Sequence, residues 1–374
     1  MVPLVVLLIG FLVTTFSLTG YAAEQKAGWQ AEWERVLQAA KQEGKVVIYG
    51  APGADWRKAL VEGFQKAYPG ISVEYMGGPA HETWPRVMAE RKAEKYVFDL
   101  LIGGTTGPVT FMKDAQIFDP LPPALILPEV RDKSLWFQGR LWYADAEEKF
   151  VLPFEASVST IIAVNPKLVT VHEFKSHWDL LNPKWRGKMV SSDIRGPGPG
   201  GGASRFLYSH KNLGPGFLQR LFGEMSITLA VDRRQMMDWL AQGKYAVALF
   251  PSGSDVVQAQ ELGLPVAPVP AENLKEGGPF SSGFGNVSLM NRAPHPNAAR
   301  LYINWLLARE AQANFQRIVK NPSLRIDVPR EGIPDFMVPK KAGEYFFSSH
   351  ESAARIGAKE IQKIVTEAVE GKKQ

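Results

Sequence analysis

Cysteine is absent from the 374-residue sequence, and histidine is scarce. Without cysteine, the chain has no disulfide, no thiolate metal site, no cysteine nucleophile and no lipid-modified cysteine anchor. The six histidines form no H-E-x-x-H motif, no P-loop lysine follows a G-x-x-x-x-G stretch, and no serine lies in a G-x-S-x-G elbow. Carboxylates such as Glu155 and Asp255 show no pairing for acid–base chemistry. We therefore expect a protein that is not an enzyme and that has no cofactor and no resident metal.

A strong excess of one charge is also lacking. Lys and Arg number 43 against 38 Asp and Glu, which gives a net charge of +5, and the basic residues are spread among the acidic ones. This pattern lacks the basic stripe that nucleic acid requires, so we predict no nucleic-acid partner. A hydrophobic content of 45% is typical of a globular protein, and the length allows two domains, each with its own core.

A long apolar run lies at the N-terminus, at residues 4–18, and GYAA follows at residues 20–23. This arrangement is typical of a secretory signal. No Lys or Arg precedes the run, which leaves an uncleaved membrane anchor as an alternative, although the run is short for a membrane span. We predict a signal peptide over residues 1–23 and a periplasmic location for the mature protein.

Short apolar or β-branched runs alternate with amphipathic helical patterns along most of the chain. The runs cover residues 45–50, 71–76, 98–102, 189–194, 227–231 and 245–250. This alternation predicts an α/β fold with two lobes, in which ligands bind beyond the carboxyl ends of parallel strands. In the first lobe, the residues expected to contact a ligand are Ala51, Pro52, Gly104, Thr105 and Thr106. The glycines in such loops often serve only as tight turns.

Residues 151–165 form a long extended segment, which we interpret as a crossover between the two lobes. Glu155 and Ser157 lie on this segment and are predicted to line the hinge side of the ligand site. The domain boundaries follow from the crossover. We assign residues 24–155 to the first part of lobe 1, 156–270 to lobe 2, and 271–374 to the return to lobe 1 and the C-terminal helices.

A glycine-rich loop at residues 196–202 separates an apolar run from a helical pattern. Bare N–H groups at such a helix start favour an anion, and Arg195 adds a planar charged fork that suits carboxylate or phosphate. The residues predicted to bind the ligand here are Arg195, Gly200, Gly201 and Gly202. Two alternatives remain open. The loop matches G-x-G-x-x-G at Gly196, Gly198 and Gly201, which suggests a dinucleotide site, or its glycines only turn the chain.

Ser252 and Ser254 lie in a P-S-G-S stretch that follows the run at residues 245–250 and precedes a helical pattern. Serine in this position either caps the helix or donates a hydrogen bond to a ligand, and the sequence does not separate the two roles. Arg233, at the start of the helical pattern at residues 234–242, is a further predicted ligand contact.

Four longer stretches carry a family resemblance. They are FDLLIGGTTGPVTFMKDAQIFDPL at residues 98–121, HWDLLNPKWRGKMVSSD at 177–193, MMDWLAQGKYAVALF at 236–250 and HPNAARLYINWLLAREAQ at 295–312. Together they resemble the type II periplasmic binding proteins of ABC importers, in particular the ferric-iron-binding-like branch, over nearly all of the chain after residue 23. The resemblance implies a two-lobe fold with a hinge and an interlobe ligand cleft, a small-molecule ligand, a membrane permease as partner, and a monomer.

The resemblance leaves the ligand to be judged from the residues of this chain. In the iron binders of that family, a tyrosine pair follows the strand that corresponds to residues 245–250 and grips the metal, whereas this chain has PSGS at 251–254. Serine hydroxyls do not replace phenolates as ligands of ferric iron. We therefore predict a small organic anion, such as a carboxylate, phosphonate or phosphate ester. Ferric iron is the alternative, and a nicotinamide-dependent enzyme is less favoured.

Overall fold

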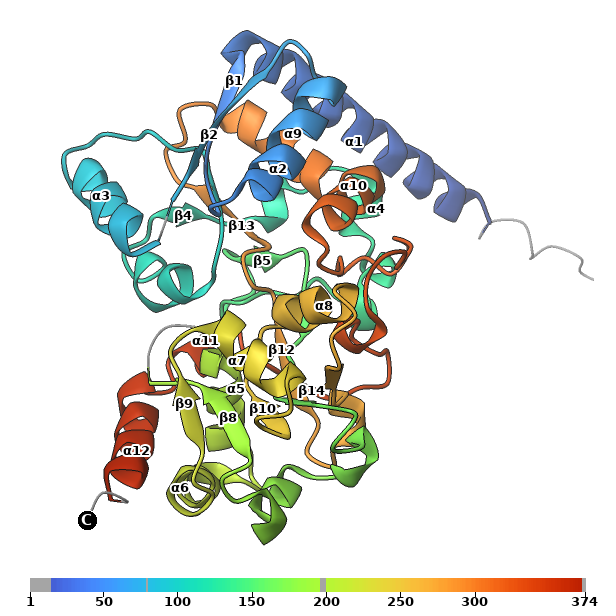
Figure 1. Cartoon of the computed structure of the whole chain (residues 1–374). Helices are drawn as coiled ribbons and strands as arrows, with labels where there is room; N and C mark the ends of the chain where they lie inside the picture. Colours follow the sequence, from blue (N-terminus) through green and yellow to red (C-terminus); the bar gives the residue numbers. More distant parts are fainter. Residues whose placement is uncertain (1–14, 79, 196–199, 372–374) are drawn as a thin grey trace, which may run out of the picture.

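The computed structural model describes residues 15–78, 80–195 and 200–371, which form two lobes, one above the other in Figure 1. The chain begins in the long helix α1 (Thr15–Glu43), whose first turns include residues 15–23 of the predicted signal peptide. The rest of that predicted segment lies outside the described residues. Within the described ranges, no helix has the length and hydrophobicity of a membrane span.

The first lobe is built on a sheet with the strand order β2-β1-β3-β13-β4, and β5 also pairs with β13. The strands are β1 (Lys45–Gly50), β2 (Ser72–Gly77), β3 (Leu100–Ile102), β4 (Phe118–Asp119), β5 (Leu152–Pro153) and β13 (Asn286–Met290). The first three are parallel, as the alternating sequence pattern predicts, because each is followed by a helical crossover. β13 is antiparallel to its neighbours. In the sequence it follows the strands of the second lobe, so the chain returns to the first sheet at this strand.

Helices cover this sheet with two apolar clusters. The helices are α1, α2 (Ala54–Ala67), α3 (Ala80–Lys92), α4 (Pro128–Arg131), α9 (Pro296–Leu307) and α10 (Arg309–Val319). One cluster includes α3, and a larger one includes the other helices. The buried Phe64 ring of α2 lies 4.8 Å from the Tyr302 ring of α9, and the Tyr302 hydroxyl donates a hydrogen bond of 2.6 Å to the Leu60 carbonyl. The sequence predicted one helix over residues 296–319, but Ala308 is extended, with φ −70° and ψ 152°. The break turns α10 so that it packs on α2.

The second lobe repeats the arrangement with the strand order β11-β7-β10-β8-β9. Its strands are β7 (Ile162–Val164), β8 (Met189–Ser192), β9 (Thr228–Ala230), β10 (Val247–Leu249) and β11 (Ala267–Pro268). Its helices are α5 (Gly200–Ser209), α6 (Gly214–Glu224), α7 (Arg233–Ala241) and α8 (Gly253–Glu261). β8, β9 and β10 are parallel, and each leads into a helix, so their carboxyl ends share one edge of the sheet.

A small third sheet lies where the chain passes between the lobes. It consists of β14 (Tyr345–Phe347), β12 (Gly278–Ser281) and β6 (Ser157–Val158). β6 continues from β5 of the first sheet and leads to β7 of the second, while β12 leads back to β13. β14 lies between α10 of the first lobe and α12 beside the second. All three crossings therefore pass through this sheet, which makes it the hinge region of the fold.

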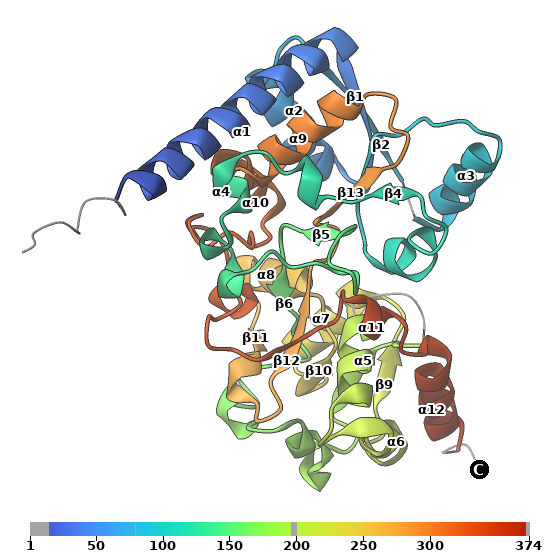
Figure 2. The same ribbon diagram turned by 180° about the vertical axis from the view of Figure 1, so that it is seen from behind.

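The C-terminal helices α11 (Glu351–Ala354) and α12 (Ala358–Glu370) lie beside the second lobe (Figure 2), where α12 packs on α5 and α6. Ion pairs tie α11 to the first lobe, because Glu351 lies 2.5 Å from Lys113 and also pairs with Arg355. Burial opposes ionisation of Glu351, but its hydrogen bonds from Lys113, Ala146 and Arg355 outweigh burial and lower its pKa to about 2. The last part of the chain thus contacts both lobes.

A buried pair in the second lobe gives a prediction for acid stability. The carboxylate of Glu276 accepts hydrogen bonds from Ser176 and from the backbone and ring of His177. Burial opposes its ionisation, but these bonds outweigh burial and lower its pKa from 4.5 to about 2. The stabilisation is present above pH 4.5 and is lost as the pH falls toward 2. We expect Glu276→Gln to lower the free energy of unfolding at pH 7 by about 3 kcal/mol.

Urea titrations between pH 7 and pH 2.5 would measure this effect. Glu272→Gln, at an exposed position on the preceding short helix, is the matched control and should behave as wild type. Equal losses of stability in E276Q and wild type on acidification would contradict the assignment.

Candidate functional site

Three helix N-termini gather at the carboxyl edge of the second sheet, since β8 leads to α5, β9 to α7 and β10 to α8. Figure 1 shows α7 and α8 on the side of the second lobe that is nearer to the first. All of the second-lobe residues predicted from sequence fall on these connections. They are Arg195, Gly200, Gly201, Gly202, Arg233, Ser252 and Ser254. Backbone N–H groups at helix starts carry partial positive charge. The start of α7 is capped by Asp232, whose carboxylate accepts a 2.7 Å hydrogen bond from the Gln235 N–H, so α5 and α8 provide the helix starts that favour an anion.

The serine pair at the start of α8 has free donor capacity. Ser252 is the residue before the helix, but its side chain makes no capping hydrogen bond to the backbone. The two hydroxyls of Ser252 and Ser254 instead lie 2.7 Å apart and bond to each other. Only one of them donates in that bond, so the pair keeps a hydroxyl hydrogen for another acceptor. This geometry differs from the capping alternative considered from sequence.

Arg195 does not stand alone as a cation. Its guanidinium lies 2.8 Å (Nε) and 2.6 Å (Nη2) from the two carboxylate oxygens of Asp193, and its backbone N–H also donates to Asp193. The hydrogen bond from Arg195 lowers the pKa of Asp193, and the same bond raises the pKa of Arg195. The pair is about one-third exposed and has no net charge. Arg195 therefore offers a ligand an oriented guanidinium group whose positive charge is balanced by Asp193.

Two glycines of the α5 start are required for close packing. A Cβ on Gly200 would lie 2.4 Å from the Ile194 side chain, and one on Gly202 would lie 2.9 Å from the Ser348 hydroxyl. Gly201 faces open space. Gly196 and Gly198 of the dinucleotide motif lie outside the described residues, while Gly201 is part of α5.

Arg233, at the start of α7, lies 3.6 Å from Asp255 of α8 and is half-exposed. It links two of the three helix starts. Asp255 Oδ2 is buried and forms no hydrogen bond with a described residue.

In the first lobe, the predicted residues follow β1 and β3 on the corresponding edge. Ala51 is buried, and its carbonyl accepts a 2.6 Å hydrogen bond from the Tyr75 hydroxyl, whereas Pro52 is exposed. Thr105 is buried, while Thr106 is exposed. Gly104 lies beside Phe284, which is 46% exposed and packs its ring 5.9 Å from Trp56. Phe284 is not predicted from the sequence, because a lone aromatic residue between glycines carries no periodic signal.

The hinge region contains a cluster of buried polar groups around Glu155. This side chain is 1% exposed, and its Oε1 accepts a 3.3 Å hydrogen bond from Asn321. Its Oε2 has no hydrogen-bond partner among the described residues, and the same holds for Ser282 Oγ and Asn286 Oδ1. Burial raises the pKa of Glu155 to about 8, although hydrogen bonds from Asn321 and Gly285 oppose the shift. Near neutral pH the carboxyl is therefore largely protonated, so it is able to donate one hydrogen bond.

Only part of this cluster could have been found from sequence. Glu155 was predicted, and so was Ser157, which pairs with Ser281 in the hinge sheet. Ser282, Asn286 and Asn321 were missed, because they come from two other segments of the chain. Among the described residues, no group of three or more His, Asp or Glu side chains is arranged to hold a metal ion.

Comparison with known proteins agrees with this architecture, which is the two-lobe fold of type II periplasmic binding proteins. The chain belongs to the bacterial extracellular solute-binding proteins, whose family model matches residues 49–313. These are solute-binding components of ABC transporters rather than enzymes. A search of curated proteins found no match.

Solved structures with this fold are similar over most of the chain. The ferric binding protein of Campylobacter jejuni is 16% identical, with a TM-score of 0.63, covering 86% of this chain and 99% of its own. The Trichodesmium protein IdiA (FutA), solved with iron and citrate, is 18% identical, with a TM-score of 0.62 and coverage of 87% and 98%. AfuA of Actinobacillus pleuropneumoniae, solved with fructose-6-phosphate, is 16% identical, with a TM-score of 0.59 and the same coverage.

Proposed function

We propose that the protein captures a small organic anion, such as a carboxylate, phosphonate or phosphate ester, between its two lobes and delivers it to a membrane permease. The mature protein acts in the periplasm as a monomer after removal of residues 1–23. The ligand contacts are those predicted from sequence, together with Phe284 at the edge of the first lobe.

The helix starts of α5 and α8 beside the Ser252–Ser254 pair are the observation that carries this proposal. Helix starts and hydroxyls donate hydrogen bonds, and an anion with several oxygens accepts many of them at once. Arg195 and Arg233 are each paired with a carboxylate, so they orient a ligand without a large excess of positive charge. Such a site suits an anion of low charge.

Reversible capture follows from the three crossings at the hinge sheet. A ligand that contacts both lobes has more contacts in the closed arrangement than in the open one, so binding favours closure. No bond is made or broken. Release to the permease requires only that the closed state be destabilised.

Ferric iron is the second candidate, since two of the similar structures are iron or ferric binding proteins by name. Against iron, the turn after β10 carries Ser252 and Ser254 rather than phenolates, and ferric iron prefers hard, anionic oxygen ligands. The example of AfuA with fructose-6-phosphate supports an organic phosphate as a ligand of this fold.

Native mass spectrometry of the exported protein tests the proposal directly. Gentle denaturation should release one small organic anion per chain, which identifies the ligand. Bound iron would instead support the second candidate, and a released dinucleotide would contradict a transport role.

The serine pair gives a sharper test once the anion is known. We expect the double variant Ser252→Ala/Ser254→Ala to bind that anion roughly tenfold to a hundredfold more weakly, because hydrogen bonds to a charged group are lost. Ser72→Ala, at an exposed serine of β2, is the control and should bind as wild type. If calorimetry gave the same affinity for the double variant as for wild type, the start of α8 would not be part of the binding site.

A further inference from the structure

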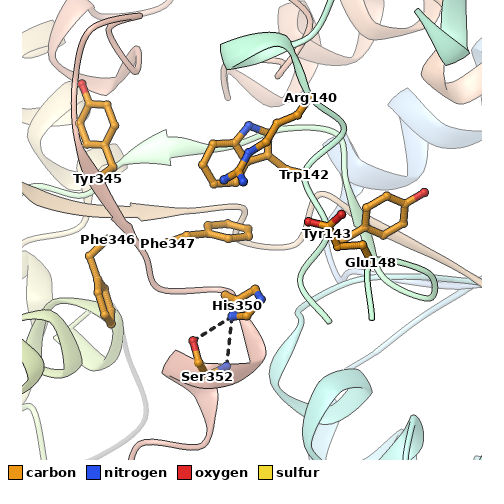
Figure 3. Close-up of a pocket in the computed structure, with 9 residues that line it drawn as sticks. All are labelled: Arg140, Trp142, Tyr143, Glu148, Tyr345, Phe346, Phe347, His350 and Ser352. Carbon is orange, nitrogen blue, oxygen red and sulfur yellow. Dashed lines mark hydrogen bonds between the residues drawn. The ribbon is translucent and has the colours of Figure 1, made fainter. Parts of the chain in front are cut away.

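A pocket of about 300 Å³ lies at the hinge region, beside β14. It is lined by residues within 140–148, which precede β5, and within 345–352, which form β14 and the start of α11 (Figure 3). We call it the hinge pocket. None of the ligand-binding residues predicted from sequence lines it.

Aromatic side chains form one wall of the hinge pocket. Trp142 is 6% exposed, and its indole N–H donates a 3.0 Å hydrogen bond to the Phe137 carbonyl. Its ring meets the Phe347 ring edge-on at 5.1 Å, and Tyr345 is fixed by a hydrogen bond from the Lys340 N–H to its hydroxyl. These rings are held in place before any ligand arrives, so they form a rigid surface for a flat apolar group.

Two opposite charges flank this wall. The Arg140 guanidinium lies over the Trp142 ring at 3.6 Å, as Figure 3 shows, and the stacking orients it. Glu148 lines the same pocket and is exposed. Neither charge forms an ion pair with a described residue. Both are therefore open to a charged partner.

His350 adds a donor with a defined orientation. Its Nδ1 accepts hydrogen bonds from the Ser352 N–H at 3.2 Å and lies 2.8 Å from the Ser352 hydroxyl. Because Nδ1 is an acceptor, the hydrogen of the neutral ring is on Nε2. The pocket thus has two donors, Arg140 and His350, and one carboxylate, Glu148.

We propose that the hinge pocket is a second binding site, which takes a zwitterion with one aromatic ring, of the chemical class of the aromatic amino acids. The ligand carboxylate accepts from Arg140, the ammonium group pairs with Glu148, and the ring packs on Tyr345 and Phe347, the partly exposed members of the aromatic wall. The volume is at the lower end of the range for small-molecule sites, roughly 300–1,000 Å³, so it suits a single ring. The site is separate from the anion site between the lobes.

Calorimetry with L-phenylalanine on the whole protein tests the ligand class. We expect one binding site per chain with a Kd below about 1 mM. Phenylacetate lacks the ammonium group and phenethylamine lacks the carboxylate, so both should bind more weakly. Failure of wild type to bind L-phenylalanine, or equal affinity for phenylacetate, would overturn the proposal.

Variants locate the site. Arg140→Gln and Glu148→Gln should each weaken binding of L-phenylalanine about three- to tenfold, as expected for exposed charge pairs. The controls are Arg131→Gln and Glu94→Gln, both exposed; Glu94 shares the positive φ of Glu148, 56° against 53°. Wild-type affinity in both R140Q and E148Q would place the binding elsewhere and refute the hinge pocket. The anion proposal is judged separately, by the molecule released in mass spectrometry.

Discussion

Replacing Glu155 with glutamine is expected to make the protein more stable than wild type at alkaline pH. Burial raises the pKa of Glu155 from 4.5 to about 8 in the folded protein. The folded state therefore holds a proton that the unfolded state releases, and its stability falls as the pH rises from 4.5 to 8. Glutamine has nearly the same shape and does not titrate. The stability advantage of E155Q over wild type should grow by about 4 kcal/mol between pH 5 and pH 8.

Urea unfolding followed by tryptophan fluorescence at several pH values measures this difference. Glu331→Gln, at an exposed position, is the control and should run parallel to wild type over the same range. A constant difference between E155Q and wild type from pH 5 to pH 8 would show that Glu155 has an ordinary pKa in the folded protein.

The second large effect is expected at Arg325, which follows α10 and is 1% exposed. Its guanidinium forms a bidentate pair with Asp327, at 2.9 and 2.7 Å, and lies 3.2 Å from a Glu129 carboxylate oxygen. It also donates to the Leu307 carbonyl at 3.1 Å. Arg325→Met would leave these acceptors without their donor. We expect the free energy of unfolding to fall by about 3–5 kcal/mol.

Arg325→Lys separates charge from geometry. Lysine keeps the charge but lacks the planar guanidinium group, so we expect part of the loss in the free energy of unfolding to remain. Arg35→Met is the control, since Arg35 is 62% exposed on α1 and lies 3.9 Å from Glu32. Its effect should be within about 0.5 kcal/mol. An equally small loss in R325M would mean that the buried network adds little stability.

Much of the first lobe could be predicted from sequence because its signals are local. The β-branched run at residues 45–50 coincides with β1, and the run at 71–76 differs from β2 by one residue at each end. The position of β13 could not be predicted in the same way. Its pattern indicates a strand but does not specify its neighbours, and its antiparallel place beside β3 depends on the whole intervening lobe.

The helix break at Ala308 shows a similar limit. Nothing in the sequence of residues 296–319 requires an extended residue there, since the break contains neither glycine nor proline. Packing of α10 on α2 outweighs the helix propensity of alanine.

The candidate site was predictable where it follows strand ends and unpredictable where it depends on tertiary contacts. Ser252, Ser254 and Gly200 follow strands and fall where the pattern indicates. The pairing of Arg195 with Asp193 was missed, although the two residues are only two positions apart, because loop conformation decides whether they meet. The partners of Glu155 in the hinge region were missed for a different reason. Glu155 meets Asn321 only after the chain has crossed between the lobes twice.

The position of β13 also bears on the order in which the lobes form during synthesis. All strands of the second sheet lie between residues 162 and 268, so that sheet is complete before β13, at residues 286–290, emerges. Until then, β3 has no partner on one side and presents an open edge. The sheet that is translated first is therefore completed last. An interruption of synthesis before residue 286 would leave a complete second sheet attached to an aggregation-prone first lobe, and a chaperone would be most needed at that stage.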